Sequence, residues 1–358
     1  MLNKIIFRCD ASHNRIGLGH LMRCLSLARV LKRSDTDIHF ICNQQSKEFE
    51  NLIINEGFKV SFICGDYHGL ILTNISNSSL EFWECDSEKS LSIIKKNQPS
   101  WLIVDHYELD ARWESIMKPH CDNIMVIDDM ANREHNCDVL LDQNLVANMH
   151  ERYNGLIPNN CIKFFGPKYA LLHDQYSKYH SKSNTRTLPI KRIFAYFGAA
   201  DAGCMEKFIN AYLMLNRNDI FVDIVIHKNN DFKDDILKKI RDKDYIKAYS
   251  EQDTLVNLIL KADLAVGSGG VSSLERCCLG LPSLVVSLAE NQIESVKELH
   301  RRNTIVWVGH KDEVSVNSLY RCIKSALENN ELEQMSKMCL DIVDGNGSER
   351  LADYILSN

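Results

Sequence analysis

A histidine follows two glycines where the first apolar strand of the chain gives way to a helix. The stretch reads Gly17-Leu18-Gly19-His20, and an amphipathic pattern begins directly after it. It lacks the third glycine of the GxGxxG dinucleotide fingerprint, but Gly17 and Gly19 leave room for a ligand beside the backbone. The helix dipole favours a neutral imidazole there, and a neutral imidazole accepts a proton. The position therefore favours His20 as a general base, and the alternative is a histidine that only caps the helix.

The richest run of small residues lies in the second half of the chain. An apolar strand ends at Gly267, and Ser268-Gly269-Gly270-Val271-Ser272-Ser273 leads into a helix. Free backbone N–H groups and hydroxyls at a helix N-terminus suit a diphosphate. The alternative is a plain capping box between Ser272 and Glu275, although the turn holds more glycine than a cap requires. Glu275 would either close that box or accept hydrogen bonds from a ribose, and the local sequence favours neither.

Three polar residues end a strand in the first half of the chain. Asp105, His106 and Tyr107 follow the apolar run that begins at Trp101. Such groups are costly to bury without partners, so this strand end is a candidate site, with a solvated loop as an equal alternative. The next two strands also end in acidic residues. Because Asp-x-Asp pairs occur only in charged, surface-like stretches, we expect no metal.

Two further loops of the second half are candidates for contacts with the same ligand. Gly198 and Asp201 belong to a small-residue turn after the first strand of that half. Asn291 and Gln292 follow a later strand, where two amides would bind sugar hydroxyl or acetamido groups. The alternative for Asn291 is an N-cap, with Glu294 three residues further on.

Short apolar runs alternate with amphipathic stretches along the whole chain, which predicts parallel sheets joined by right-handed helical crossovers. Predicted helices include Leu21–Arg33, Glu206–Leu215, Thr254–Lys261 and Ile293–Arg302. The predicted strands are Lys4–Cys9, Ile38–Asn43, Lys59–Ile63, Trp101–His106, Asn123–Asp129, Asp138–Asp142, Ile162–Phe165, Arg192–Gly198, Asp223–Lys228, Tyr245–Tyr249, Leu264–Gly267, Ser283–Leu288 and Thr304–Val308.

A polar segment with a proline, His180–Pro189, separates two sets of strands and reads as a linker. We therefore predict an α/β protein of two doubly wound, Rossmann-like domains, residues 1–180 and 190–358. Open parallel sheets bind ligands at the carboxyl ends of their strands. Two such domains facing each other would form a cleft, where ligands often bind.

Composition bounds the function further. The chain has 358 residues, of which 45% are hydrophobic and 25% charged, with a net charge of -6 and no basic block. A dedicated nucleic-acid binder is therefore disfavoured. The longest apolar runs are strand-sized, so we expect no membrane insertion, and the first residues lack a signal-peptide pattern, which predicts a cytoplasmic enzyme. The thirteen cysteines form an odd set without CxxC and read as reduced core thiols.

Several long motifs resemble one family. They are FRCDASHNRIGLGHLMRCLSLA, IVDHY, IDDMANREHNCDVLLDQN, RYNGLIPNNCIKFFGPKYALL, GSGGVSSLERCCLGLPSLVVSLAENQ and DGNGSERLA, spread over residues 5 to 354. Together they are similar to the hydrolases of pseudaminic acid biosynthesis that act on UDP-2,4-diacetamido-2,4,6-trideoxy-β-L-altropyranose. More distantly, the pattern resembles the N-acetylglucosaminyltransferase that makes lipid II, which has the two-domain GT-B architecture.

The resemblance implies that water attacks the anomeric carbon of a UDP-sugar, with C–O cleavage and inversion, and without a cofactor. It implies that His20 is the catalytic base and that Asp105, Tyr107 and Asn291 belong to the catalytic site. His106 and Gln292 would contact substrate. The nucleotide loop would be Ser268–Ser273, with Glu275 toward the ribose. Neighbouring enzymes of the same cell-surface sugar pathway are candidate partners.

Three points stay open from the sequence. Ala199 stands where the family pattern has a second glycine after Gly198, which puts the backbone detail near the phosphates in doubt. The imidazole of His20 would be oriented by Asp10 or Asp105, or by a neutral Ser12. The rival function is a GT-B glycosyltransferase that uses a sugar or lipid acceptor in place of water.

Overall fold

The computed structural model describes residues 3–11, 18–43, 47–63, 81–198, 201–228, 230–250, 252, 254–328 and 330–358. By contacts within the chain it divides into two compact units. Unit 1 comprises Met1–Gln143, Asn148–Leu171 and Ser348–Asn358, and unit 2 comprises Asn144–Ala147 and Leu172–Gly347.

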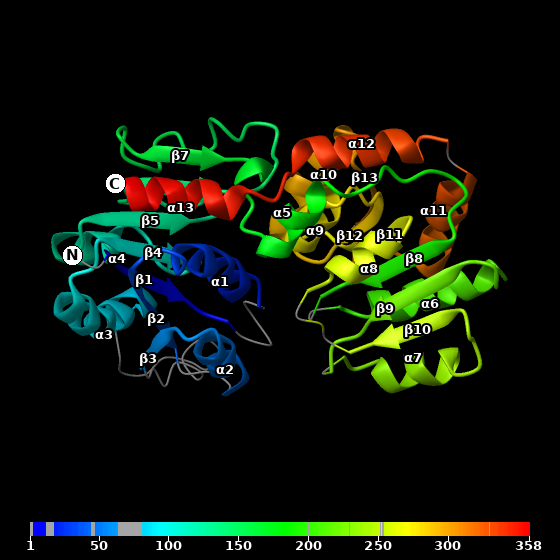
Figure 1. Cartoon of the computed structure of the whole chain (residues 1–358), viewed down its shortest axis with the longest axis horizontal. Helices are drawn as coiled ribbons and strands as arrows, with labels where there is room; N and C mark the ends of the chain where they lie inside the picture. The colour runs from blue at the N-terminus through cyan, green and yellow to red at the C-terminus, as the bar shows by residue number, and fades with distance from the viewer. Residues whose placement is uncertain are drawn as a thin grey trace. The chain divides into compact units, whose positions relative to one another are not determined.

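Unit 1 is built on a parallel sheet of seven strands in its described part (Figure 1). The spatial order is β3-β2-β1-β4-β5-β6-β7, so the direction of winding reverses between β1 and β4. All neighbouring strands pair in parallel. The strands are β1 (Asn3–Cys9), β2 (Thr36–Asn43), β3 (Lys59–Ile63), β4 (Trp101–Asp105), β5 (Asn123–Ile127), β6 (Val139–Asp142) and β7 (Ile162–Phe165).

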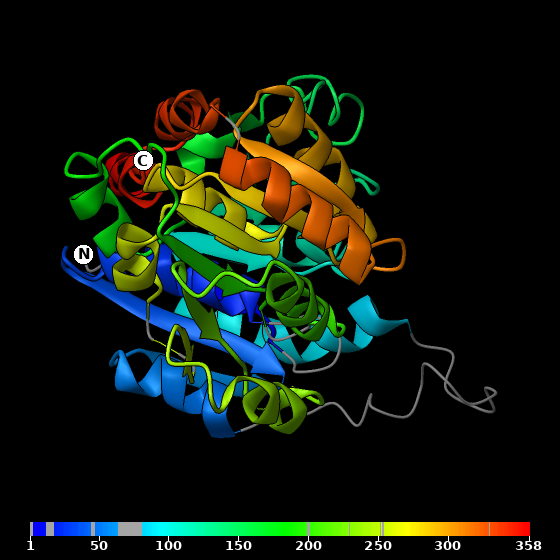
Figure 2. The same cartoon turned by 90° about the vertical axis from the view of Figure 1, so that its right-hand side faces the viewer.

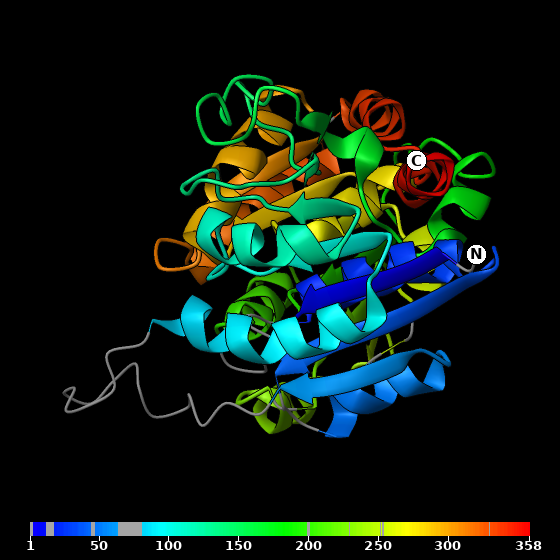
Figure 3. The ribbon, with the colours of Figure 1, turned by 90° about the vertical axis from the view of Figure 1, so that its left-hand side faces the viewer.

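Helices cover both faces of this sheet, because alternate residues of each strand point to opposite sides. Ile5 and Phe7 of β1 pack in a core with α1 (Gly19–Leu31), α2 (Lys47–Asn55) and α13 (Gly347–Ser357). Ile6 points to the other face, where α3 (Phe82–Asn97) and α4 (Ala111–Met117) supply the buried side chains. Figure 3 shows α3 and α4, in cyan, in front of the blue strand β1.

Unit 2 repeats this architecture around a six-stranded parallel sheet of order β10-β9-β8-β11-β12-β13, which reverses between β8 and β11. The helices α6, α7 and α11 contribute to the core on one face (Figure 2). The strands are β8 (Arg192–Tyr196), β9 (Phe221–Val225), β10 (Ile246–Tyr249), β11 (Leu264–Ser268), β12 (Ser283–Ser287) and β13 (Ile305–His310). The helices are α5 (Asp174–His180), α6 (Cys204–Met214), α7 (Lys233–Ile240), α8 (Val256–Lys261), α9 (Val271–Cys278), α10 (Ile293–Arg301), α11 (Val316–Glu328) and α12 (Leu332–Ile342).

The two doubly wound parallel sheets confirm the predicted fold class, and a strand lies at each of the thirteen predicted places. Their ends differ by a few residues. The short 3-10 helices η2 (Lys118–His120), η3 (Pro167–Tyr169) and η4 (Glu290–Gln292) are additions that the sequence pattern did not indicate.

The chain passes from unit 1 to unit 2 at Leu171 and Leu172, ahead of the polar segment 180–189. That segment packs within unit 2, because the buried Arg186 donates to the carbonyl oxygens of Ala262 and Leu279. The last helix also differs from the predicted division, since α13 places Leu351 in the core of unit 1. Local polarity cannot reveal which apolar face a distant helix will cover.

Within the described ranges, no helix has both the length and the hydrophobicity needed to cross a bilayer. The cysteines in these ranges are free thiols, most of them buried.

Candidate active site

His20 lies in the first turn of α1, at the carboxyl end of the sheet of unit 1. The parallel register pairs Cys9 of β1 with Asp105 of β4, so the loops that follow both strands meet where the winding reverses. This is the position at which open α/β sheets bind ligands. Helix α1 begins at Gly19 without a side-chain cap, so the alternative of His20 as a cap is not what the structure has.

Asp105 is the group that orients His20. Its Oδ1 is hydrogen-bonded to Nδ1 of the His20 ring, and the carboxylate is fully buried. Burial opposes its charge, but Arg23 and His20 outweigh that effect and hold the pKa of Asp105 well below its usual range. An ionised carboxylate only accepts hydrogen bonds, so Nδ1 of His20 carries the proton. The lone pair of Nε2 is then available to take a proton from another molecule.

Arg23 completes this arrangement, although the sequence motifs did not single out Arg23 as a site residue. Its Nε lies 2.6 Å from Oδ2 of Asp105 and its Nη2 lies 2.6 Å from Oδ1, a bidentate pair. A third nitrogen, Nη1, lies 3.1 Å from Oδ2 of Asp129. The guanidinium therefore balances the charge of the carboxylate that holds His20. The i, i+3 spacing of His20 and Arg23 on a predicted helix was a signal that could have found it.

Tyr107 packs against His20 edge to face, with ring centroids 4.4 Å apart. Burial and the neighbouring Asp129 carboxylate raise the pKa of Tyr107 well above its usual value. The phenol is therefore neutral at physiological pH and can donate a hydrogen bond but cannot serve as a base. The Oδ1 atom of Asp129 is buried and, among the described residues, accepts no hydrogen bond.

His106 belongs to the framework rather than to the reacting surface. Its Nε2 donates to Oδ2 of Asp10 at 2.9 Å, and its Nδ1 accepts from the backbone N–H of Glu108 at 3.1 Å. The ring of Phe82 stacks on it at 5.2 Å. The ring is buried and both nitrogens are engaged, so the expected contact between His106 and substrate is revised to a supporting role.

Asp10 pairs with Arg8 as well as with His106, and therefore does not orient His20. The shortest contact between Arg8 and Asp10 is 2.6 Å, and the backbone and side-chain amides of Asn43 also donate to Asp10, each at 2.8 Å. Burial opposes its charge, but Arg8 and His106 hold the pKa of Asp10 well below its usual range. Gly17 and Ser12 lie outside the described residues.

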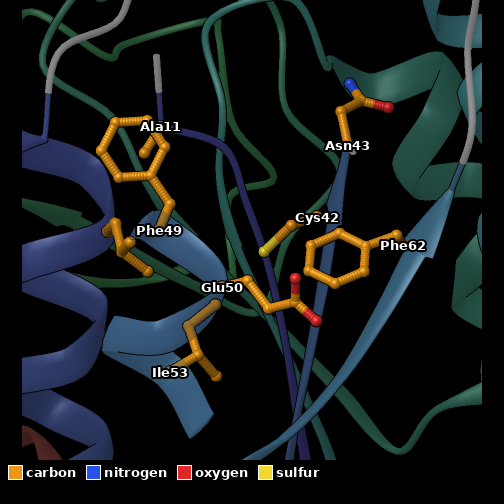
Figure 4. A pocket seen from close by; sticks show the side chains of 8 residues that line it. Ala11, Cys42, Asn43, Phe49, Glu50, Ile53 and Phe62 are labelled. Atoms are coloured by element: carbon orange, nitrogen blue, oxygen red, sulfur yellow. The ribbon is translucent and has the colours of Figure 1, made fainter. Parts of the chain in front are cut away.

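A small apolar pocket adjoins this network (Figure 4). Asn43, the partner of Asp10, stands at its edge, and Leu21 follows His20 directly. The figure shows Phe49 of α2 and Phe62 of β3 with their rings in the same pocket. The full lining is Ala11, Leu21, Cys42, Asn43, Phe49, Glu50, Ile53 and Phe62.

In unit 2, the small-residue turn connects β11 to α9 where that sheet reverses its winding. The N-cap of α9 is Gly270, and no side chain caps the helix. The capping box between Ser272 and Glu275 is therefore absent, and Ser272 lies inside the first turn. Glu275 is partly exposed on α9. Desolvation of its carboxyl group by neighbouring residues raises its pKa, and Tyr176 and Arg276 oppose that shift.

Two glycines of this turn are required for packing. A Cβ at Gly267 would collide with the backbone oxygen of Tyr196, and one at Gly269 would collide with a methyl of Val296. A Cβ at Gly270 would only contact Nε2 of Gln292, at 3.6 Å. Gly267 and Gly269, which the sequence suggested for ligand binding, are therefore also needed for packing, because they let the end of β11 lie close to Tyr196 and Val296.

The serines of the turn divide into two kinds. Ser273 is buried and donates to the backbone oxygen of Ser268 at 3.0 Å, so its hydroxyl holds the turn. The hydroxyls of Ser268 and Ser272 lie 3.3 Å apart, and Ser272 is partly exposed. Ser268 and Ser272 therefore remain the serine candidates for ligand contact, and the expected contact from Ser273 is revised to a supporting role.

Asn291 and Gln292 lie directly before α10. Gln292 accepts from the backbone N–H of Leu288 at 2.9 Å through Oε1, and its Nε2 lies beside the turn. Asn291 sits in η4, and the N-cap of α10 is Gln292, so the capping alternative for Asn291 is wrong.

Asp201 is used within unit 2. It accepts from the backbone N–H of Met205 at 2.8 Å and from Asn230 at 2.5 Å, and burial raises its pKa. Its expected role as a substrate ligand is therefore revised to that of a group that orders the start of α6. Gly198 has φ of +79°, which favours glycine, whereas Ala199 lies outside the described residues.

Among the described residues, no group of three His, Cys, Asp or Glu side chains is arranged as the ligands of a metal ion would be.

Three curated proteins are similar to this chain in sequence, although no protein-family profile matches it. An uncharacterized protein of Methanocaldococcus jannaschii is 24% identical over 286 residues, 78% of this chain and 54% of that protein. The UDP-2,4-diacetamido-2,4,6-trideoxy-beta-L-altropyranose hydrolase of Campylobacter jejuni is 27% identical over 173 residues, 48% of this chain and 53% of the relative. The match thus spans about half the length of these two relatives. The spore coat polysaccharide biosynthesis protein SpsG of Bacillus subtilis is 22% identical over 349 residues, 94% and 93% of the two chains.

Two solved structures share the architecture of this chain. MurG of Acinetobacter baumannii superposes with a TM-score of 0.65 at 11% identity, covering 99% of this chain and 100% of that structure. The UDP-GlcNAc 2-epimerase of Neisseria meningitidis, solved with UDP-GlcNAc, gives 0.59 at 14% identity with the same coverage. The chain has the GT-B fold.

Proposed function

We propose that this protein is a hydrolase that splits a UDP-linked 2,4-diacetamido-2,4,6-trideoxy sugar into UDP and the free sugar, in pseudaminic acid biosynthesis. The observation that carries the proposal is the hydrogen bond between Nδ1 of His20 and the buried carboxylate of Asp105, which fixes the tautomer of the ring. The similarity to the Campylobacter jejuni hydrolase supports the substrate class.

In this proposal His20 removes a proton from water as the water attacks the anomeric carbon. General-base catalysis of this kind contributes about 10²- to 10⁴-fold. Asp105 stabilises the imidazolium as it forms, and Arg23 keeps the carboxylate ionised. Tyr107 packs edge to face against the ring and holds its orientation from one side.

The leaving group is UDP, whose terminal phosphate has a second pKa of about 6 and departs as an anion. No general acid is then needed, which explains why one histidine suffices where many glycosidases use two carboxylates. The turn between β11 and α9 binds the diphosphate through backbone N–H groups and the hydroxyls of Ser268 and Ser272. Glu275 accepts hydrogen bonds from the ribose.

The amides of Asn291 and Gln292 are proposed to bind the sugar, together with the backbone at Gly19. A single displacement by water inverts the anomeric centre. We also propose that the enzyme works in the cytoplasm beside other enzymes of the same sugar pathway.

A glycosyltransferase is the second candidate, and the GT-B fold that the chain shares with MurG favours it. The two functions differ in the acceptor. Incubating the UDP-diacetamido sugar with enzyme alone and following the reaction by NMR separates them, because only the hydrolase releases free sugar in amounts equal to UDP.

The variant His20→Ala tests the assignment of the base. We expect turnover to fall by at least 10²-fold while UDP affinity stays unchanged, since the nucleotide is bound by unit 2. Turnover close to that of the wild type would refute the role of His20. Absence of any UDP release from the wild-type enzyme would instead refute the hydrolase.

A further inference from the structure

A buried arginine lies under the turn that is proposed to bind the diphosphate. Arg276 on α9 is 1% exposed, and the four hydrogen bonds that its guanidinium makes with described residues all go to neutral oxygens. Nη2 lies 2.7 Å from the backbone oxygen of Ser268 and 3.1 Å from Oγ of Ser273. Nη1 lies 3.2 Å from Oγ of Ser272, and Nε lies 3.0 Å from Oγ of Ser283.

The buried arginines of unit 1 are different, because each is paired with carboxylates. Arg8 contacts Asp10 and Asp86, and Arg23 contacts Asp105 and Asp129. Arg276 forms no ion pair with a described carboxylate. Burial lowers its pKa, and the charge of Glu275, which is not in ion-pair contact, opposes that shift only in part. A buried charge without a counter-ion in direct contact is costly, so its retention calls for a compensating interaction.

The guanidinium of Arg276 lies at the N-terminal end of its helix. Helical side chains lean toward the N-terminus, and the guanidinium of Arg276 reaches back to the first turn of α9. The helix dipole is positive there, so the two fields add instead of cancelling. Arg186 shows the opposite arrangement, because it donates to Ile259 of α8 and to Leu279, the C-cap of α9. Carbonyl oxygens at helix C-termini carry partial negative charge, which stabilises a cation without a carboxylate.

The guanidinium also orders the hydroxyls that are proposed to bind the diphosphate. Ser272 accepts from Arg276 and shares one hydrogen bond with Ser268, so one of the two hydroxyl protons remains to donate outward. A cation at the start of such a chain polarises it and strengthens that donor.

We propose that Arg276 is a positioning residue for the diphosphate of the substrate. It acts through Ser268 and Ser272, and its buried positive charge, added to the N-terminus of α9, makes the turn selective for a polyanion. This inference rests on the proposed function, because it assumes that the turn binds UDP. It goes further in assigning the selectivity for the charged part of the nucleotide to one buried side chain.

The test compares a charged with an uncharged probe. Dissociation constants for UDP, inorganic pyrophosphate and uridine are measured by calorimetry on the full-length protein and on Arg276→Met. We expect UDP and pyrophosphate to bind about 10- to 100-fold more weakly in the variant, and uridine to bind within about twofold of the wild type. Arg276→Lys keeps the charge and should restore most of the difference.

Arg186→Met is the matched control, a buried arginine of the same unit that lies at helix C-termini. It should lower the melting temperature but leave the ratio of UDP to uridine affinity unchanged. If Arg276→Met does not fold, Arg276→Gln gives the answer, because its amide can still donate to the oxygens under the turn while the positive charge is removed.

The binding measurements distinguish a failure of this inference from a failure of the proposed function. Equal losses of UDP and uridine affinity in Arg276→Met would mean that Arg276 only supports the fold. An unchanged ratio in that variant, or in Arg276→Gln where the first does not fold, would also overturn the inference while the proposed function stands. Wild-type protein that binds neither UDP nor pyrophosphate would overturn both.

Discussion

Replacing Asp105 by asparagine removes one negative charge from the buried group that holds His20. The amide side chain is similar in size, so packing changes little. Its NH₂ group can donate to Nδ1 of His20, which moves the ring proton to Nε2 and destroys the base. In triads of this kind the same exchange lowers kcat by about 10⁴-fold, and we expect a loss of about 10³- to 10⁴-fold here.

The same substitution leaves Arg23 with only Asp129, 3.1 Å away, to balance its charge. Breaking a buried ion pair costs about 3–5 kcal/mol. Because Asp129 remains, we expect a loss near the lower limit, about 3 kcal/mol in the free energy of unfolding. For a unit of this size that corresponds to a fall of roughly 6–12 °C in melting temperature.

The assay combines release of UDP with thermal unfolding and UDP binding. Asp10→Asn is the control, since Asp10 is equally buried, pairs with an arginine that keeps a second carboxylate, and does not contact His20. It should be destabilised to a similar extent but keep turnover within about tenfold of the wild type. If Asp105→Asn keeps wild-type turnover, or if both variants lose turnover equally, the assigned tautomer of His20 is wrong.

Two other predictions follow from the buried carboxyls and from α9. Asp10 and Asp105 have pKa values below their usual range, so below about pH 4 the unfolded chain binds more protons than the folded one, and the free energy of unfolding decreases as the pH is lowered. Urea titrations from pH 6 to 3 should show this decrease, and the decrease should be smaller in Asp10→Asn. Glu275→Ala should weaken UDP and uridine binding alike, by about tenfold, because both contain the ribose; unchanged affinities would remove Glu275 from the site.

The alternation of apolar runs and helical stretches was enough to predict the sheets, because strand and helix patterns are local. Small residues after β11 and polar residues after β4 marked the strand ends at which the two sheets reverse their winding. The same local rules could not distinguish Asp105 from Asp10 as the partner of His20. Both follow or end apolar strands, and their pairing depends on the register of β1 with β4.

The sequence by itself determined the fold class and the loops that can carry chemistry, since short-range patterns specify both. Only the tertiary structure decided which buried arginines are paired with a carboxylate. Arg23 and Arg276 both lie on helices, at positions that the sequence pattern does not distinguish. Contacts with β4 make Arg23 a partner of Asp105, whereas Arg276 donates to the end of β11 and forms no ion pair with a carboxylate in the described ranges. Pairing of this kind depends on residues far apart in the chain, because burial and hydrogen bonding are set by the folded neighbourhood.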